Sequence, residues 1–290
     1  MDEPAEKAGL RNAWGRVAGA YEEGWAERTA HLTAIGLDAL EAPGGGRGLD
    51  IACGPGRTTA ALGERLGTGE ALGVDFAPAM VERAAGRYGD RRGLAFAVDD
   101  AERLSQPDDA FDVVTCSFGL MYCYDAAAAV RQMARVVRPG GRVLNVVWGR
   151  APHVWFVPVI ELIETRAEYY SAVCPLMFFY GLPGVLPRML GEAGLDTLAT
   201  RTIDGRMRFP TVEEAVETAI VAGPLWGLFS NRLDAARQAE VREALTAHVE
   251  RVAEAGPDGI ALPTEVVVVV GERALRGRVL PRSRRSTPGG

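Results

Sequence analysis

The sequence predicts an α/β fold built on a Rossmann-like, doubly wound sheet, and three observations lead to this class. Short apolar runs alternate with helix-like segments over residues 46–150, a pattern that favours parallel strands with helices on both faces. A glycine-rich turn, Gly54-Pro55-Gly56, follows the first apolar run. Acidic residues, Asp75 and Asp100, end the next two runs, where open α/β sheets bind ligands.

Composition excludes several other classes. The chain has 290 residues, of which 48% are apolar and 24% charged, as is usual for one large globular domain with insertions. Its formal net charge of −6 argues against nucleic-acid binding, because neutralising phosphates needs a basic face. No apolar run approaches the roughly 20 residues of a membrane span, and no signal peptide is recognisable. We therefore expect a cytoplasmic protein without a membrane span.

The first 45 residues predict a helical cap. Residues 1–12 read as a loose arm, and apolar residues then recur at steps of three and four over residues 13–40. Pro43 and the three glycines that follow end this helix. Lys7 is the only lysine in the chain, which we interpret as a composition bias and not as a binding signal.

Residues 46–150 predict the core of the sheet. The expected strands are 48–52, 71–75, 94–98, 111–116 and 142–147, and the expected helices are 57–66, 78–88 and 126–137. Pro78 suits the first turn of a helix, where its missing N–H costs nothing. The pattern becomes irregular after this core. We expect an aromatic lid insertion over 151–184, a core helix and strand over 185–210, a helical lid insertion over 211–262, a final core strand over 263–273 and a disordered tail over 274–290.

The glycine turn indicates a cofactor without a pyrophosphate. A dinucleotide-binding turn has a third glycine three residues after the second, and this chain has Thr59 there. Asp50 stands beside the turn, where a carboxylate would repel a pyrophosphate. The helix that follows the turn directs its free N–H groups back toward it.

The acidic residues at the strand ends indicate a nucleoside. A carboxylate at Asp75 can accept hydrogen bonds from both hydroxyls of a ribose. Asp100, with a neighbouring backbone N–H, could recognise the amino group and a ring nitrogen of an adenine. Ser117 ends the fourth strand, which lies beside the first in such sheets.

These segments together resemble the class I S-adenosylmethionine-dependent methyltransferases, in particular their ubiquinone/menaquinone-biosynthesis-like group. The resemblance covers about residues 14–150, in the family's order. It is carried by Asp50-Ile51-Ala52-Cys53-Gly54-Pro55-Gly56, Gly73-Val74-Asp75-Phe76-Ala77-Pro78-Ala79-Met80, Asp100-Ala101-Glu102-Arg103-Leu104, Phe111-Asp112-Val113-Val114 and Arg135-Val136-Val137-Arg138-Pro139-Gly140-Gly141.

The resemblance implies a seven-stranded sheet whose last strand is antiparallel, and S-adenosyl-L-methionine as cofactor with S-adenosyl-L-homocysteine as product. It implies that Asp50 and Gly54 lie along the methionine half, Asp75 and Phe76 at the ribose and adenine, and Ser117 at the sulfonium. Tyr21 would close over the methionyl end. The full set of expected cofactor contacts is Tyr21, Asp50, Ala52, Gly54, Gly56, Asp75, Phe76, Met80, Asp100, Ala101 and Ser117.

The expected reaction is an in-line transfer of the methyl group to a hydrophobic or aromatic small molecule, in secondary metabolism, by a monomer or homodimer. His153, after the fifth strand, is a candidate base. Aromatic residues of the cap and of the two insertions are candidates for lining the substrate site: Tyr21, Trp155, Tyr169, Tyr180, Trp226 and Phe229. No cluster predicts a metal site. A cyclisation on the same fold, or a non-catalytic cofactor-binding protein, stays as an alternative.

Overall fold

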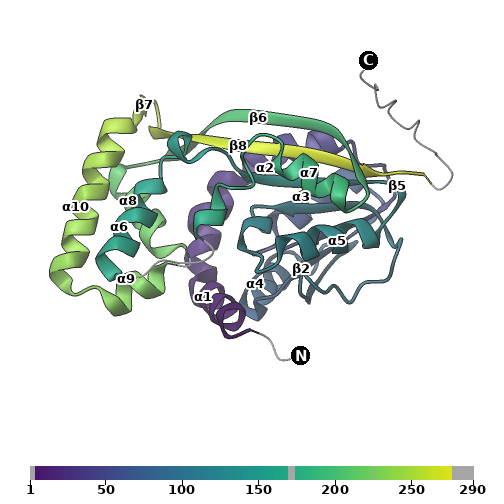
Figure 1. Cartoon of the computed structure of the whole chain (residues 1–290), viewed down its shortest axis with the longest axis horizontal. Coiled ribbons are helices and arrows are strands. Elements are labelled where there is room, and N and C mark those ends of the chain that lie inside the picture. The colour runs from purple at the N-terminus through teal and green to yellow at the C-terminus, as the bar shows by residue number, and fades with distance from the viewer. Residues whose placement is uncertain (1–3, 169–173, 224, 276–290) are drawn as a thin grey trace, which may run out of the picture.

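An eight-stranded sheet with helices around it organises the computed structural model of this chain, which describes residues 4–168, 174–223 and 225–275 (Figure 1). The strands are β1 Arg47–Ile51, β2 Glu70–Asp75, β3 Leu94–Val98, β4 Phe111–Ser117, β5 Val137–Trp148, β6 Leu195–Phe209, β7 Glu254–Gly256 and β8 Gly259–Arg273. The α-helices are α1 Ala5–Tyr21, α2 Glu27–Leu40, α3 Arg57–Leu66, α4 Pro78–Tyr88, α5 Ala126–Val136, α6 Val157–Ala167, α7 Val185–Glu192, α8 Val212–Val221, α9 Trp226–Arg232 and α10 Ala235–Val252. Shorter turns are the π-helix η1 Glu22–Ala26 and the 3-10 helices η2 Leu120–Tyr122, η3 Ala151–His153 and η4 Cys174–Met177.

The strand order confirms the predicted fold class. The order is β3-β2-β1-β4-β5-β8-β6, and the short β7 pairs with the end of β8. Strands β1 to β5 pair in parallel, whereas β8 is antiparallel to both of its neighbours, β5 and β6. The order reverses between β1 and β4, so their carboxyl ends meet at the switch point where open α/β sheets bind ligands.

Helices cover the two faces of the sheet. A Cβ added at Gly36 of α2 would lie 2.9 Å from Val146, so α2 packs on the Val146 face. Gly271, the register partner of Val143, faces Leu190 of α7. Val143 and Val146 are an odd number of residues apart on one strand, so α2 and α7 lie on opposite faces. In the described part of the chain, no helix combines the length and apolar character that crossing a membrane requires.

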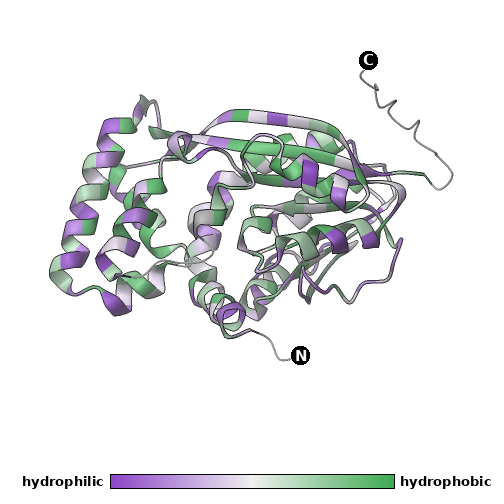
Figure 2. Ribbon diagram, in the orientation of Figure 1, coloured by the Kyte–Doolittle hydropathy of each residue, from purple (hydrophilic) through white to green (hydrophobic). Residues whose placement is uncertain are grey.

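Strands β8 and β6 extend beyond the parallel strands as a long antiparallel pair. The five valines of β8, Val266 to Val270, are at most 6% exposed, and Figure 2 shows this strand hydrophobic along most of its length. Pairing with β6 continues past the valines as far as Phe209 and Ile260. At this far end of the two strands, helices α6, α8, α9 and α10 gather to one side of the parallel strands, and α1 lies between them and those strands (Figure 1). Their buried residues continue the hydrophobic core of the sheet.

The N-terminal segment differs from its prediction. Helix α1 begins at Ala5, so the expectation of a loose arm through residue 12 is wrong from that residue on. The predicted single helix is also divided, because the π-helix η1 separates α1 from α2. Helix α1 packs through Trp14 and Val17 onto Ala77 and Met80 at the start of α4, in a small cluster separate from the main core.

Candidate functional site

The glycine turn joins β1 to α3 through residues with positive φ. Ala52 has a φ of 55°, Gly54 of 53° and Gly56 of 84°. Such backbone is easily adopted by glycine and strained for alanine. A Cβ at Gly56 would lie 2.8 Å from the Cβ of Ala84, so this glycine allows α4 to approach. Gly56 therefore shapes the turn from behind and does not line the cavity above it.

Asp75 fixes the turn to the end of β2. Its Oδ2 accepts a hydrogen bond from the Gly54 N–H at 2.9 Å, and its Oδ1 accepts one from the Ala77 N–H at 2.9 Å. The residue is 6% exposed, and burial raises the pKa of its carboxyl to about 6, although the two N–H donors favour the ionised form. Asp75 thus presents a carboxylate edge to the cavity from a rigid position.

Asp50 is buried beside the turn, between α3 and β4. It is 1% exposed, and its oxygens accept hydrogen bonds from the hydroxyls of Thr59 on α3 and Thr115 on β4. Burial raises the pKa of Asp50 to about 7. The carboxylate ties α3 and β4 to the turn, so Asp50 supports the turn in this structure, and its contact along the methionine half stays a prediction.

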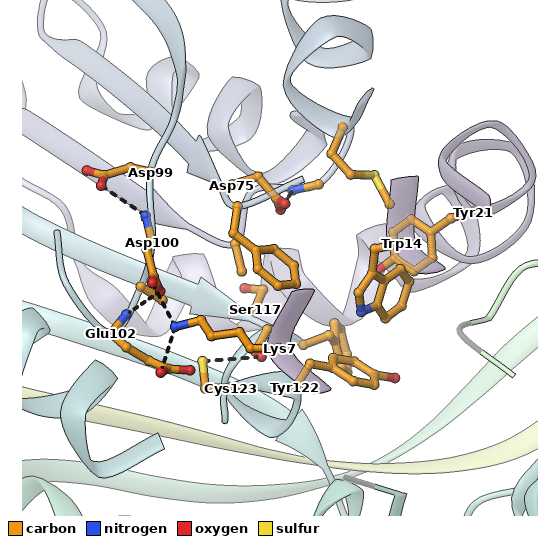
Figure 3. Close-up of a pocket in the computed structure, with 17 residues that line it drawn as sticks. Lys7, Trp14, Tyr21, Asp75, Asp99, Asp100, Glu102, Ser117, Tyr122 and Cys123 are labelled. Atoms are coloured by element: carbon orange, nitrogen blue, oxygen red, sulfur yellow. Dashed lines mark hydrogen bonds and ion pairs between the residues drawn. The ribbon is translucent and has the colours of Figure 1, made fainter. Parts of the chain in front are cut away.

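The loop after β3 holds its carboxylates through its own backbone. Asp99 accepts hydrogen bonds from the N–H of Asp100 and from the N–H and hydroxyl of Ser105. The Oδ1 of Asp100 accepts from the Glu102 N–H at 3.0 Å. Its Oδ2 meets the ammonium of Lys7, which reaches the loop from α1 (Figure 3).

These elements line a cavity at the carboxyl edge of the sheet, whose empty space of about 680 Å³ includes its opening to solvent. We call it the cofactor cavity. Of the predicted cofactor contacts, the structure brings together Tyr21, Ala52, Gly54, Asp75, Phe76, Met80, Asp100, Ala101 and Ser117. The remaining lining residues were not predicted: Lys7, Trp14, Asp99, Glu102, Phe118, Gly119, Tyr122 and Cys123. Lys7, Trp14 and Tyr21 recur every seven residues, which is a signal of one helical face that the sequence contains.

A second cavity, the aromatic cavity, adjoins the first. Its volume is about 580 Å³, and its walls are Trp14, Tyr21, Trp25, Thr29, Phe118, Tyr122, Trp148, Phe156, Val159, Ile160, Met177, Ala219, Ala222, Gly223 and Leu225. The rings contact one another closely, with centroids 4.2 Å apart for Phe118 and Trp148 and 4.8 Å for Trp25 and Phe156. Trp14, Tyr21, Phe118 and Tyr122 belong to both cavities.

A third, polar cavity of about 860 Å³ lies between α2 and α3, and Tyr21 and Phe118 line it as well. Tyr21 therefore stands at the junction of all three cavities. Burial, with the nearby Asp75 carboxylate, raises the pKa of the Tyr21 hydroxyl far above its ordinary value, so it stays protonated. Phe118 has a φ of 56°, which is strained for a bulky residue and is typical of functional positions.

The predicted substrate-lining residues lie mostly behind the aromatic cavity. Trp155 is 2% exposed and packs between Trp25 and Phe209. Phe229 is fully buried against Trp226, in the interior of the lid. Tyr180 is also buried, outside the walls of the described cavities. Of this set only Tyr21 lines the aromatic cavity, and Tyr169 lies outside the described residues.

His153 lies away from these walls. It ends the short helix η3, is exposed, and lines none of the cavities described here. Its nearby charged partner is Glu265, whose pKa is lowered chiefly by its hydrogen bond to Arg150 and to a smaller extent by His153. The structure does not bring His153 to the predicted site. Among the described residues, no group of three His, Cys, Asp or Glu side chains is placed to hold a metal ion.

The strand order, together with a cavity at the switch point that is lined by acidic residues from the strand ends, defines a class I methyltransferase fold. Comparisons with known proteins support the same class. Residues 49–141 match the methyltransferase domain family. The demethylmenaquinone methyltransferase of Deinococcus radiodurans is 30% identical over 178 residues, which cover 61% of this chain and 67% of that protein.

Two solved structures share the fold. The YcgJ protein from Bacillus subtilis superposes with a TM-score of 0.53 at 20% identity and covers 84% of this chain and 98% of its own. The [4+2]-cyclase SpnF superposes with a TM-score of 0.56 at 20% identity and covers 87% and 83%. The chain belongs to the class I S-adenosylmethionine-dependent methyltransferases of the ubiquinone/menaquinone type.

Proposed function

We propose that the enzyme transfers the methyl group of S-adenosylmethionine to an apolar, aromatic small molecule of secondary metabolism. One observation carries the proposal: the aromatic cavity and the cofactor cavity share Trp14, Tyr21, Phe118 and Tyr122 as a common wall. A cofactor bound in one cavity and an acceptor bound in the other would therefore lie next to each other, along the border that these four residues form. In-line transfer needs this arrangement, with the reacting atoms about 3–3.5 Å apart.

The residues of the cofactor cavity suit the proposed cofactor. The Ser117 hydroxyl is buried, has no hydrogen-bond partner among the described residues, and lines this cavity, so a polar ligand group there would satisfy it. Asp75 would accept the ribose hydroxyls, and Asp100 with Ala101 would bind the adenine edge. When bound, the sulfonium supplies an activated methyl group.

The walls of the aromatic cavity support the substrate class. Its rings and aliphatic side chains offer apolar surface, and its described side-chain oxygens are hydroxyls of threonine and tyrosine. Such a lining favours an apolar ring over a charged ligand and excludes water from the transfer. The name of the Deinococcus relative points to a quinone-type ring, so demethylated quinones, with polyketide and indole compounds, are the first acceptors to test.

Methyl-labelled S-adenosylmethionine tests the proposal. Incubated with the purified enzyme and an acceptor panel, it should yield a labelled aromatic product and S-adenosylhomocysteine in equal amounts. An unlabelled, rearranged product would instead show the cyclisation alternative. Label transferred only to charged acceptors would contradict the assigned substrate class.

A further inference from the structure

Helix α1 covers the cofactor cavity along its length. Lys7, Trp14 and Tyr21 lie on one face of the helix at seven-residue spacing, and all three line the cavity. At 1.5 Å per residue, this face spans about 21 Å. Lys7 stands at the Asp99–Glu102 loop, as Figure 3 shows, and Tyr21 lies near the glycine turn, so the helix runs from one end of the site to the other.

The two ends of α1 are held differently. At the C-terminal end, Glu22 forms ion pairs with Arg83 and Arg87 of α4 at 2.9 and 2.7 Å. The π-helix η1 begins at this point and interrupts the regular hydrogen bonding between α1 and α2, and such π-turns within helices are frequent at functional sites. In between, α1 packs through a small cluster that is separate from the main core. The geometry favours a helix that pivots at η1 and is released at its N-terminal end.

Lys7 ties that N-terminal end to the loop after β3. Its ammonium lies 2.7 Å from the Oδ2 of Asp100 and 2.7 Å from the Oε2 of Glu102, and its side chain is only 9% exposed. Glu102 is held from its other side by the Tyr124 N–H at 2.6 Å. Burial lowers the pKa of Lys7, but the hydrogen bonds to both carboxylates outweigh this and leave it above its ordinary value. The ion pairs therefore persist at neutral pH.

We propose that Lys7 is the latch of a helical gate: its ion pairs with Asp100 and Glu102 hold α1 over the cofactor cavity and break when the cofactor enters or the product leaves. The inference rests on the proposed binding of cofactor in this cavity. It makes Lys7 a positioning residue, because the ammonium acts through α1 and not on the reacting atoms. In the closed state the latch also sets Trp14 and Tyr21 into the wall shared with the aromatic cavity.

Stopped-flow binding of S-adenosylhomocysteine, followed by tryptophan fluorescence, tests the latch. Lys7→Met keeps the length of the side chain and removes its charge, so the gate should open more often. We expect the association and dissociation rate constants both to rise about tenfold, because charge-assisted bonds are lost before the gate opens. The dissociation constant should change less than about threefold. Lys7→Arg should stay near the wild-type rates.

Matched controls separate gating from a structural effect. Arg65→Met removes an ion pair with Asp38 between α2 and α3, outside the lining of the cofactor cavity, and should leave both rates unchanged. Glu102→Gln should raise both rates as Lys7→Met does. Unchanged rates in Lys7→Met, or a faster dissociation alone, would overturn the latch, since a static wall residue affects only dissociation.

The sole lysine allows a second readout. Acetylation by an amine-directed reagent, followed by peptide mapping, reports Lys7 separately from the N-terminal amine. Saturating S-adenosylhomocysteine should slow acetylation of Lys7 at least tenfold, and an unchanged rate would overturn the coupling of latch and ligand. Neither readout uses an acceptor, so a missing methyl transfer leaves the latch intact, whereas wild-type protein that binds no S-adenosylhomocysteine overturns both proposals.

Discussion

Protonation of Asp75 should control cofactor binding below neutral pH. The carboxyl is buried, and its pKa is raised to about 6. Only the ionised form accepts hydrogen bonds from both ribose hydroxyls. If the bound complex requires that form, the apparent dissociation constant scales with 1 + 10^(pKa − pH). Calorimetry with S-adenosylhomocysteine should therefore show about tenfold weaker binding at pH 5 than at pH 8.

Protonation of Asp75 has the opposite effect on folding stability: a lower pH weakens cofactor binding but stabilises the ligand-free fold. The folded-state pKa of Asp75 lies above the ordinary aspartate value of 3.8, so the folded, ligand-free protein holds the proton more tightly than the unfolded chain. This contribution is fully present below about pH 4 and is lost as the pH rises through about 6. The increase in melting temperature caused by S-adenosylhomocysteine should consequently be larger at pH 8 than at pH 5.

Asp75→Asn removes the titration. Two charge-assisted hydrogen bonds, each worth about 1.5–3 kcal/mol, are lost, so binding at pH 8 should weaken by about two to four orders of magnitude and become independent of pH. Asp50→Asn is the control, because burial also raises the pKa of Asp50, to about 7, although that residue lies outside the cavity. Asp50→Asn should retain the pH dependence. A flat profile in Asp50→Asn, or a wild-type affinity that is constant from pH 5 to pH 8, would refute the reasoning.

Three further changes test other parts of the site. Gly56→Ala should lower the free energy of unfolding by at least about 2 kcal/mol, because of its φ of 84° and the close Ala84, whereas Gly86→Ala on open helix surface should not destabilise; urea denaturation compares the two. His153→Ala should keep kcat/KM within about twofold, since the residue is exposed and lines none of the cavities; a large loss would restore its predicted catalytic role. Ile160→Trp should fill the aromatic cavity and raise the acceptor KM without changing the affinity for S-adenosylhomocysteine; equal effects on both ligands would contradict the division into two cavities.

The residues at the carboxyl edge of the sheet could be predicted from the sequence, because glycine turns and strand ends are recognisable from neighbouring residues alone. Gly54 and Asp75 stand at strand ends, and parallel strands bring such ends together. The place of Asp50 could not be predicted in this way. Its partners are Thr59 on α3 and Thr115 on β4, and only the packed sheet brings these hydroxyls to the carboxylate. The strand position of an acidic residue does not say whether its side chain faces the ligand or the supporting structure.

In the lid, the sequence was a still weaker guide to which side chains face the ligand. The lid's aromatic residues were predicted to line the substrate site, yet Trp155 is buried between Trp25 and Phe209, and Phe229 is buried in the interior of the lid. Hydrophobicity indicates burial, and a lid of several helices has its own interior to fill before it has a surface to offer. The rings of the aromatic cavity come largely from elsewhere, from Trp25 in the cap and from Phe118 and Trp148 at the sheet edge. Segments that are far apart in the sequence thus come together to form these walls, so the sequence pattern alone does not reveal them.

The shared wall has a consequence for specificity. Trp14 and Tyr21 lie on the same helix face as Lys7, and they line both the cofactor cavity and the aromatic cavity. Any movement of α1 that opens the first cavity therefore also removes part of the second. Tyr21, which the sequence assigned first to the cofactor, is thus equally part of the surface that would select the acceptor. If α1 gates the cofactor cavity as proposed, it would couple cofactor retention to acceptor choice, and the single lysine of the chain ion-pairs its N-terminal part to Asp100 and Glu102.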